Sequence, residues 1–308
     1  MRVVFMGNPD FAIPTLKAIN SSKHKLVAVV SNPPKNMGRG KISSYTPVGQ
    51  FSKDNDILLF EPESLKSDEL NNALLVLKPD IFVIVAYRIL PEKLIQIPRH
   101  GAINLHASLL PKYRGAGPIQ WALMNGDKET GVTIFQIKPR VDSGDILYQA
   151  KIKILKQDNM LSLGNRLCNR GAKMIIKILD DIGKGILLNP IKQDSSLVTY
   201  APKITKEMTF IKWEWSSYKI HNWIRGLSPY PGMSTFYKGK RLRVFKTAIV
   251  RSDLIKPAGS IISNNNNLIV ATGDGALSIL ELQLEGKKKM KIDDFLRGTD
   301  IEIGALFR

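Results

Sequence analysis

The sequence contains only one thiol that could form a disulfide or bind a metal. Its 308 residues include a single cysteine, Cys168, which excludes an intrachain disulfide and a cysteine-based metal site. Cys168 lies in a segment with helical periodicity, so we interpret it as a small buried hydrophobic side chain rather than a nucleophile. The cysteine therefore gives no indication of the protein's chemistry.

Long apolar segments are also absent from the sequence. No apolar run approaches the ~18 residues that indicate a transmembrane helix. The N-terminal apolar stretch, Val3–Met6, stops at Gly7 and is shorter than the apolar region of a secretory signal peptide. We therefore expect a cytoplasmic protein that has no contact with a membrane.

Negative charge is scarce relative to positive charge. The chain has 45 lysines and arginines against 27 aspartates and glutamates, which gives a net charge of +18 at pH 7. A field of this sign attracts polyanions such as nucleic acids. A lysine-rich solvated surface would carry the same charge, so composition alone leaves both interpretations open.

The first part of the chain alternates short apolar runs with amphipathic stretches. Alternation of this kind predicts a parallel sheet covered by helices on both faces. A long helix over Met160–Lys184 would close this α/β domain, which we place at residues 1–189. The expected strands are Val3–Met6, Leu26–Val30, Ile57–Phe60, Ile81–Val85, Ala102–Leu105 and Val132–Ile137, and the other expected helices are Asp10–Asn20 and Asp68–Leu77.

The character of the sequence changes near residue 186. Residues 190–206 mix proline, serine, aspartate and lysine, a composition typical of a linker. Ser216 stands where it can cap a helix that carries Ile220 and Ile224 on one face. Short apolar runs then follow at close spacing and predict a small β-barrel within residues 207–308. These runs are Leu242–Phe245, Gly259–Ile262, Leu268–Ala271 and Leu277–Leu282.

The first strand and helix do not form a dinucleotide site. Their turn contains one glycine, Gly7, whereas dinucleotide-binding turns have the pattern G-x-G-x-x-G. Pro9 and Phe11 would also obstruct the close approach of the backbone to a pyrophosphate group. A nicotinamide-dependent dehydrogenase is therefore disfavoured.

Polar side chains gather at the carboxyl end of the predicted strand Ala102–Leu105. Residues two apart in a strand face the same side, so Asn104 and His106 project together. Open parallel sheets place their active sites at this end of their strands. Asp142 lies in the loop after the strand Val132–Ile137. We expect its carboxylate to lie at about the same height along the sheet as Asn104 and His106.

An amide, an imidazole and a carboxylate suit acyl transfer to an amine. The amide of Asn104 can donate a hydrogen bond to an oxyanion, an effect worth about 10²–10³ in rate. His106 can donate to the same oxygen or move a proton, an effect worth about 10²–10⁴, and Asp142 can orient His106. Direct transfer between two bound substrates needs no serine or cysteine nucleophile. These residue types are also common in purely structural roles: a histidine often ends a strand, and an aspartate before Ser143 often forms part of a turn. The residue types alone therefore do not decide whether the set is catalytic.

Three segments resemble the folate-dependent formyltransferase family. They are Asn104–Ala116, with the sequence NLHASLLPKYRGA, the block Gly131–Ile146, and the opening Val4–Ala12. The resemblance implies a Rossmann-like parallel-sheet catalytic domain and 10-formyltetrahydrofolate as formyl donor, without a metal. It assigns the family's catalytic roles to Asn104, His106 and Asp142. The residues implied to contact the folate are Ser108, Leu109, Leu110 and Pro111.

Two further features resemble the branch of this family that acts on methionyl-tRNA. The basic segment Ser31–Pro47 resembles the inserted loop that engages the tRNA acceptor end. Its cations Lys35, Arg39 and Lys41 are suited to phosphate contacts. The segments Tyr200–Ile204, Ile224–Gly232 and Gln283–Lys288 resemble that branch's C-terminal OB-like domain, a fold suited to nucleic acid.

The implied activity is formylation of the amino group of initiator methionyl-tRNA by a monomeric enzyme. Two alternative functions are disfavoured. A related formyltransferase could act on a nucleotide-linked sugar or a ribonucleotide amine, but the loop and the C-terminal segments disfavour this. A non-enzymatic nucleic-acid-binding protein would have no use for the set Asn104, His106 and Asp142.

The sequence departs from the family pattern at two places. The opening segment has Asn8 where the family more often has threonine. The segment Ala86–Pro91 is one residue shorter than the common form and has Arg88 in place of glycine. This segment borders the folate pocket in the family, whereas the three catalytic positions match the pattern.

Overall fold

The computed structural model describes residues 1–37, 42–251, 256–265 and 267–308. The chain forms two compact units. The first contains residues 1–115, 130–153 and 164–200, and the second contains residues 116–129, 154–163 and 201–308. Residues 116–129 and 154–163, which precede the expected linker in sequence, therefore belong to the second unit.

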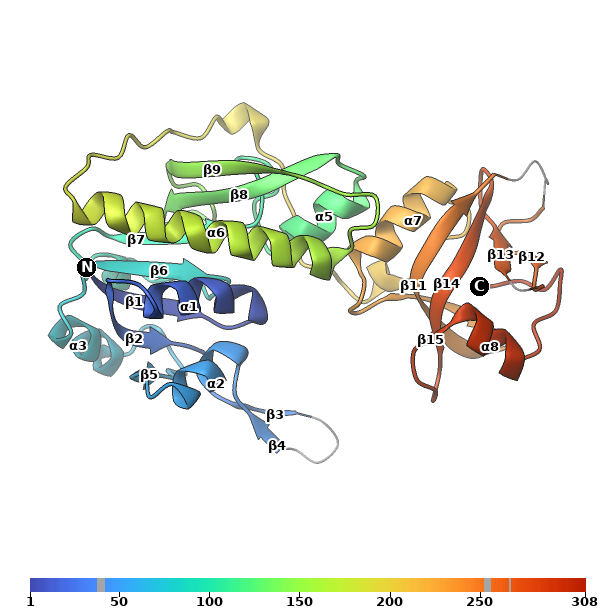
Figure 1. Ribbon diagram of the computed structural model, residues 1–308, viewed down its shortest axis with the longest axis horizontal. Helices are drawn as coiled ribbons and strands as arrows, with labels where there is room; N and C mark the ends of the chain where they lie inside the picture. Colours follow the sequence, from blue (N-terminus) through green and yellow to red (C-terminus); the bar gives the residue numbers. More distant parts are fainter. Residues whose placement is uncertain (38–41, 252–255, 266) are drawn as a thin grey trace. The chain divides into compact units, whose positions relative to one another are not determined.

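The first unit is built on a seven-stranded sheet with the order β5-β2-β1-β6-β7-β8-β9 (Figure 1). Neighbours from β5 to β7 are parallel, and β8 runs antiparallel to β7. The predicted α/β class is confirmed. The strands are β1 (Arg2–Gly7), β2 (Lys25–Val30), β5 (Leu59–Phe60), β6 (Ile81–Val85), β7 (Ala102–His106), β8 (Glu129–Gln136) and β9 (Ile146–Lys153).

Two helices of the first unit, α2 (Pro47–Asp54) and α3 (Asp68–Val76), begin at a capping side chain. Thr46 accepts a hydrogen bond from the backbone N–H of Gly49, and Ser67 accepts one from Leu70. Such caps are worth ~1 kcal/mol each. The expected helix from Asp10 is divided into a 3₁₀ turn, η1 (Asp10–Ala12), and α1 (Ile13–Asn20). The others are α2 (Pro47–Asp54), α3 (Asp68–Val76), α4 (Glu92–Ile95) and most of α6 (Met160–Gly183), and a 3₁₀ turn, η2, spans Ser195–Leu197.

Helix α6 packs directly on the strand that carries the predicted site. It runs along one face of the sheet in Figure 1. A Cβ atom on Gly171 would lie 2.4 Å from Cδ2 of Leu105, so a larger residue there would force the Leu105 side chain to move. Because Leu105 faces α6, its neighbours Asn104 and His106 face the opposite side of β7. Cys168 is buried in the same helix, as predicted.

No helix in the described ranges is both long enough and apolar enough to cross a membrane.

The second unit contains an antiparallel sheet that curls into a half-barrel (Figure 1). Its strand order is β10-β11-β14-β13-β12, and β15 pairs with β14. This sheet confirms the predicted OB-like fold class. The strands are β10 (Met233–Tyr237), β11 (Lys240–Val250), β12 (Ile261–Ser263), β13 (Leu268–Ala271), β14 (Ala276–Leu284) and β15 (Met290–Lys291), accompanied by α5 (Pro118–Met124), α7 (Ser217–Gly226), α8 (Ile292–Gly298) and the 3₁₀ turn η3 (Glu207–Thr209).

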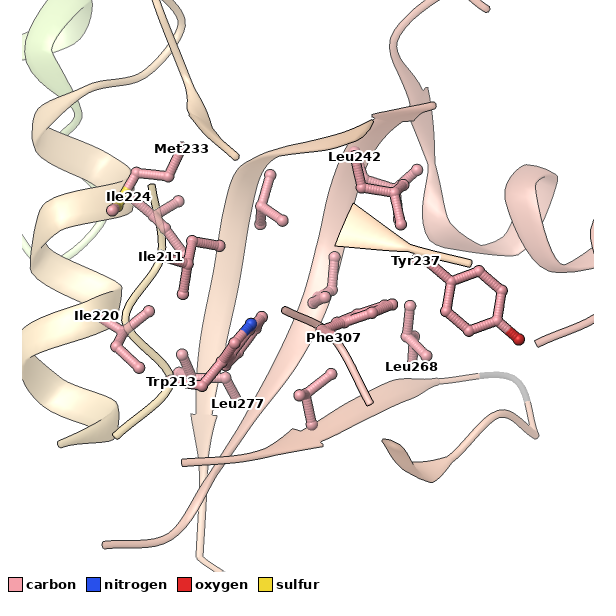
Figure 2. Close-up of a cluster of buried hydrophobic side chains, with 14 of the residues drawn as sticks. Ile211, Trp213, Ile220, Ile224, Met233, Tyr237, Leu242, Leu268, Leu277 and Phe307 are labelled. Carbon is pink, nitrogen blue, oxygen red and sulfur yellow. The ribbon is translucent and has the colours of Figure 1, made fainter. Parts of the chain in front are cut away.

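The core of the second unit lies between α7 and the sheet (Figure 2). Ser216 caps α7 by accepting from the N–H of Lys219, as predicted. The helix then buries Ile220 and Ile224 against the strands. Trp213 is 3% exposed, and its indole N–H donates to Oγ1 of Thr235 at 3.0 Å, so its one polar atom is satisfied.

Candidate active site

Strand β7 presents Asn104 and His106 at the carboxyl end of the parallel part of the sheet. Asn104 is paired with Ile84 on β6 and with Phe135 on β8, so its backbone is held on both sides. Its side-chain amide is partly exposed and has no hydrogen-bond partner in the described part of the chain. His106 is 6% exposed. The structure thus brings the two predicted residues together and leaves the amide available.

The imidazole of His106 is oriented by a backbone carbonyl. Its Nε2 lies 2.8 Å from the carbonyl oxygen of Tyr113. Because a carbonyl oxygen can only accept, Nε2 must carry the hydrogen. In the neutral ring Nδ1 is then unprotonated, and it faces Oδ2 of Asp142 at 3.8 Å. His106 is therefore held in the tautomer that can accept a proton at Nδ1.

Asp142 is positioned by the backbone rather than by a direct hydrogen bond to His106. Its Oδ2 accepts from the N–H of Gly115 at 2.8 Å. Asp142 itself has φ 49°, a left-handed conformation that is uncommon for residues other than glycine. The carboxylate lies beyond hydrogen-bond distance from the neutral ring, yet close enough to stabilise an imidazolium.

Gln193, which no sequence pattern identified as part of the site, holds the Asp142 loop. Its amide nitrogen donates to the carbonyl oxygens of Asp142 at 2.9 Å and Gly144 at 2.7 Å. Its amide oxygen accepts from Nε and Nη2 of Arg114. A single glutamine in a segment with the composition of a linker carries no pattern that would have identified it. Only the fold shows that this buried amide connects the two loops of the site.

The backbone of the predicted folate-contacting segment is held by side chains of β8 and β9. Oγ1 of Thr133 donates to the carbonyl of Ser108 at 2.7 Å and accepts from the N–H of Leu110 at 3.1 Å. Gln149 donates to the carbonyl of Leu110 at 2.9 Å. Ser108 and Leu110 are buried, whereas Leu109 and Pro111 are partly exposed. The exposed pair is therefore better placed to touch a ligand, and the buried pair to hold the segment in shape.

Arg88, one of the departures from the family pattern, forms a structural link. Its guanidinium donates to the carbonyl oxygens of Glu63 at 3.0 Å and Pro62 at 2.8 Å. It also donates to the hydroxyl of Tyr87 at 2.9 Å, and burial raises the pKa of that hydroxyl. Arg88 thus ties the shortened segment to the chain that follows β5.

Asn8, the other departure, anchors the base of the basic loop. Its Oδ1 accepts from the N–H of Asn32 at 2.9 Å and from the hydroxyl of Ser31 at 3.2 Å. The hydroxyl of Ser31 is also 2.5 Å from that of Thr46, at the other end of the loop. The amide oxygen of Asn8 therefore helps to bring the two ends of the loop together.

The basic loop contains two paired strands. Strand β3 (Lys35–Met37) is antiparallel to β4 (Ile42–Ser44). Lys35, predicted to contact tRNA, is exposed. Arg39 and Lys41 lie outside the described residues.

The arrangement has the parts that acyl transfer to an amine requires. Asn104 offers an N–H donor, His106 offers a proton acceptor at Nδ1, and Asp142 lies beside that nitrogen. In the described ranges no group of three or more His, Cys, Asp or Glu side chains is arranged to hold a metal ion.

Comparison with known proteins identifies the family. Residues 1–179 match the model described as formyl transferase, and residues 203–300 match the formyl transferase C-terminal domain. The chain is 43% identical to a methionyl-tRNA formyltransferase of Caldanaerobacter subterraneus subsp. tengcongensis, over 100% of both chains.

Solved structures of similar fold include two formyltransferases. The methionyl-tRNA formyltransferase of Clostridium thermocellum has a TM-score of 0.55 and 18% identity, covering 81% of this chain and 94% of its own. The N-formyltransferase of Helicobacter canadensis, in complex with folinic acid and dTDP-3-aminofucose, has a TM-score of 0.68 and 20% identity, covering 94% and 100%. These likenesses bear on the fold alone. Both family models and the full-length relative show that this chain belongs to the formyl transferase family.

Proposed function

We propose that this protein transfers the formyl group of 10-formyltetrahydrofolate to the α-amino group of initiator methionyl-tRNA. The observation that carries the proposal is the free amide of Asn104 beside a histidine whose Nδ1 can accept a proton. Full-length relatives at about 40% identity are named methionyl-tRNA formyltransferases. The tRNA substrate also implies a cytoplasmic enzyme.

The reaction is a direct transfer between two bound substrates. The amine nitrogen forms a bond to the formyl carbon, and the carbonyl oxygen gains negative charge that the amide N–H of Asn104 stabilises. The amine proton passes to Nδ1 of His106, directly or through water, and Asp142 stabilises the resulting imidazolium. The bond from the formyl carbon to N10 of the folate then breaks, and N10 takes up a proton. Holding both substrates in one site supplies much of the rate.

The folate is proposed to lie against the segment Ser108–Pro111. The partly exposed side chains of Leu109 and Pro111 offer an apolar contact for the pterin. Ser108 and Leu110 support them from the interior through the hydrogen bonds to Thr133 and Gln149. The folinic acid in the name of the Helicobacter canadensis complex supports a folate as donor.

A second candidate, formylation of a nucleotide-linked sugar or ribonucleotide amine, is less well supported. The relatives that match the whole chain at 38–43% identity carry the methionyl-tRNA name, whereas the sugar-directed neighbour is 20% identical. Incubation with 10-formyltetrahydrofolate and each acceptor in turn tests the choice. Formylation of methionyl-tRNA alone is expected, and formylation of the amino sugar nucleotide or glycinamide ribonucleotide instead would contradict it.

Arg39 is expected to act in tRNA engagement, together with Lys35 and Lys41. The change Arg39→Ala is expected to lower kcat/KM for methionyl-tRNA by roughly tenfold or more, since a phosphate contact is lost. Binding of 10-formyltetrahydrofolate should not change. The matched control is Arg170→Ala, which removes an exposed arginine from α6. Equal kinetics for the two variants would remove the role assigned to the loop.

Gln193 is expected to act as a positioning residue. The change Gln193→Ala is expected to lower kcat roughly 10- to 100-fold, because the Asp142 loop loses two hydrogen bonds and small displacements in a site are costly. The KM for methionyl-tRNA should not change. Gln193→Glu should not restore turnover, because a carboxylate oxygen would face the carbonyls of Asp142 and Gly144. If Gln193→Glu restores turnover, Gln193 acts only by filling space and not through its two donated hydrogen bonds. The control is Gln50→Ala, which changes an exposed glutamine.

A further inference from the structure

A pocket of about 280 Å³ lies entirely within the second unit, and none of the residues assigned to catalysis lines it. Its walls come from α7, from the turn that precedes α6, from β11 and from the chain near Lys289. The volume is close to the lower end of the range for small-molecule sites, ~300 Å³. The pocket is therefore large enough for a phosphate group and part of an attached sugar.

Arg225 places a partly buried positive charge in this pocket. Its Nε donates to the side-chain oxygen of Asn222 at 2.9 Å, and its Nη1 donates to the carbonyl of Leu155 at 3.3 Å. In the described ranges Arg225 takes part in no salt bridge, and its Nη2 makes no hydrogen bond. Burial lowers the pKa of the guanidinium. A cation in such surroundings gains from an anionic ligand.

The acidic side chains of the pocket are already engaged. Asp158 attracts Arg225, but its carboxylate accepts from the N–H of Leu155 at 2.7 Å and the hydroxyl of Ser162 at 2.9 Å. Glu281 is paired with Lys289 at 2.6 Å. These two carboxylates therefore do not fill the donor sites that Arg225 leaves open.

Two further lysines line the pocket and make it cationic. Lys156 and Lys246 are exposed and take part in no salt bridge within the described part of the chain. The lining thus contains four cations and two carboxylates, together with His221. Burial and the nearby Arg225 lower the pKa of His221, and its Nδ1 lies 3.0 Å from the hydroxyl of Thr247.

One part of the remaining wall is apolar, beside the polar side chains of Gln157, Asn159, Ser228 and Thr247. Ile224, Pro229 and Phe245 line the pocket beside the cations. An apolar wall next to a guanidinium suits a ligand whose phosphate is attached to a sugar or base. The four cations of the lining would repel a metal ion. A purely apolar ligand would leave the guanidinium of Arg225 without an anionic partner.

We propose that this pocket binds a single phosphate group carried by a nucleotide, with Arg225, Lys156 and Lys246 as its donors. This inference rests on the proposed function, under which the backbone of the tRNA supplies the phosphate. A free mononucleotide or inorganic phosphate offers the same chemistry, and the test below separates the sources.

The test compares two double variants of the full-length chain. Lys156→Ala with Lys246→Ala removes the two exposed cations of the pocket and leaves the structural contacts of Arg225 in place. Lys212→Ala with Lys256→Ala removes two exposed lysines of the same unit that lie outside the pocket. Binding of uncharged tRNA is measured at several salt concentrations, without folate. The result therefore does not depend on whether formyl transfer occurs.

The pocket variant is expected to bind tRNA roughly tenfold more weakly than the control variant, with a salt slope reduced by about one. In a second arm, thermal unfolding is measured with inorganic phosphate and with AMP. If tRNA binding matches the control but phosphate or AMP raises the Tm of the unaltered protein and not of the pocket variant, the site takes a free phosphate. If the two variants match in both arms, the proposal is wrong.

Discussion

Replacing His106 by alanine is expected to lower kcat for formyl transfer by about 10²–10⁴-fold, the range typical of a lost general acid–base group. The structure gives the reason. The carbonyl of Tyr113 holds the hydrogen on Nε2, which leaves Nδ1 to receive the proton of the attacking amine beside Asp142. Affinity for tRNA and for the folate should change little, because His106 is buried and offers little contact area.

Changes at the two neighbouring side chains, Asn104 and Asp142, are expected to lower turnover for different reasons. Asn104→Ala is expected to lower kcat by about 10²–10³-fold through loss of one oxyanion donor. Asp142→Asn keeps the acceptor for the N–H of Gly115 but removes the charge that stabilises the imidazolium. The control is His100→Ala, at an exposed histidine outside the site. Thermal unfolding first establishes that the His106→Ala variant is folded. If its turnover is then close to that of His100→Ala, the role assigned to His106 is contradicted.

Replacing Gly144 by alanine is expected to destabilise the first unit and to abolish most of the activity. A Cβ atom there would lie 1.5 Å from the carbonyl oxygen of Gln136, a backbone atom at the end of β8 that cannot rotate away. The loop must shift, and Gly144 follows Asp142 by two residues. We expect a loss of about 3 kcal/mol or more in the free energy of unfolding, beyond what most substitutions cause.

Gly183 provides the matched control for this change. It lies at the end of α6, and a Cβ atom there would meet only Cγ of Met1, at an ordinary 3.6 Å. Gly183→Ala is therefore expected to leave stability unchanged or slightly raised, since alanine is the better helix former. Denaturant unfolding and kcat are measured for both variants. If Gly144→Ala keeps the midpoint and turnover of the control, the loop is not constrained as described.

The sequence predicted the parts of the site that follow from periodicity. Alternation along a strand placed Asn104 and His106 on one side of β7, and the close approach of α6 to Leu105 explains which side. Asp142, the third residue of the site, was assigned through the resemblance to the formyltransferase family, because by itself it looks like part of a turn. The elements that were missed have weak patterns. Strand β9 alternates polar and apolar residues without a long apolar run, and α5 is a single short helix.

The orientation of His106 could not be predicted, because it depends on contacts between distant segments. The expected partner of the ring was Asp142, whereas the hydrogen bond goes to the carbonyl of Tyr113 and the carboxylate lies at 3.8 Å. Gln193 was hidden for the same reason, since its partners precede it by about 50 positions or more in sequence. Such contacts follow from the packed fold and leave no local signature.

The most direct test of the proposed function is formyl transfer to two tRNAs that carry the same amino acid. Initiator and elongator methionyl-tRNA are each incubated with the protein and 10-formyltetrahydrofolate, and formyl-methionine is quantified over the first turnover. We expect rapid formylation of the initiator species and little of the elongator. No formylation of either tRNA, under conditions in which the folate is bound, would contradict the proposed function.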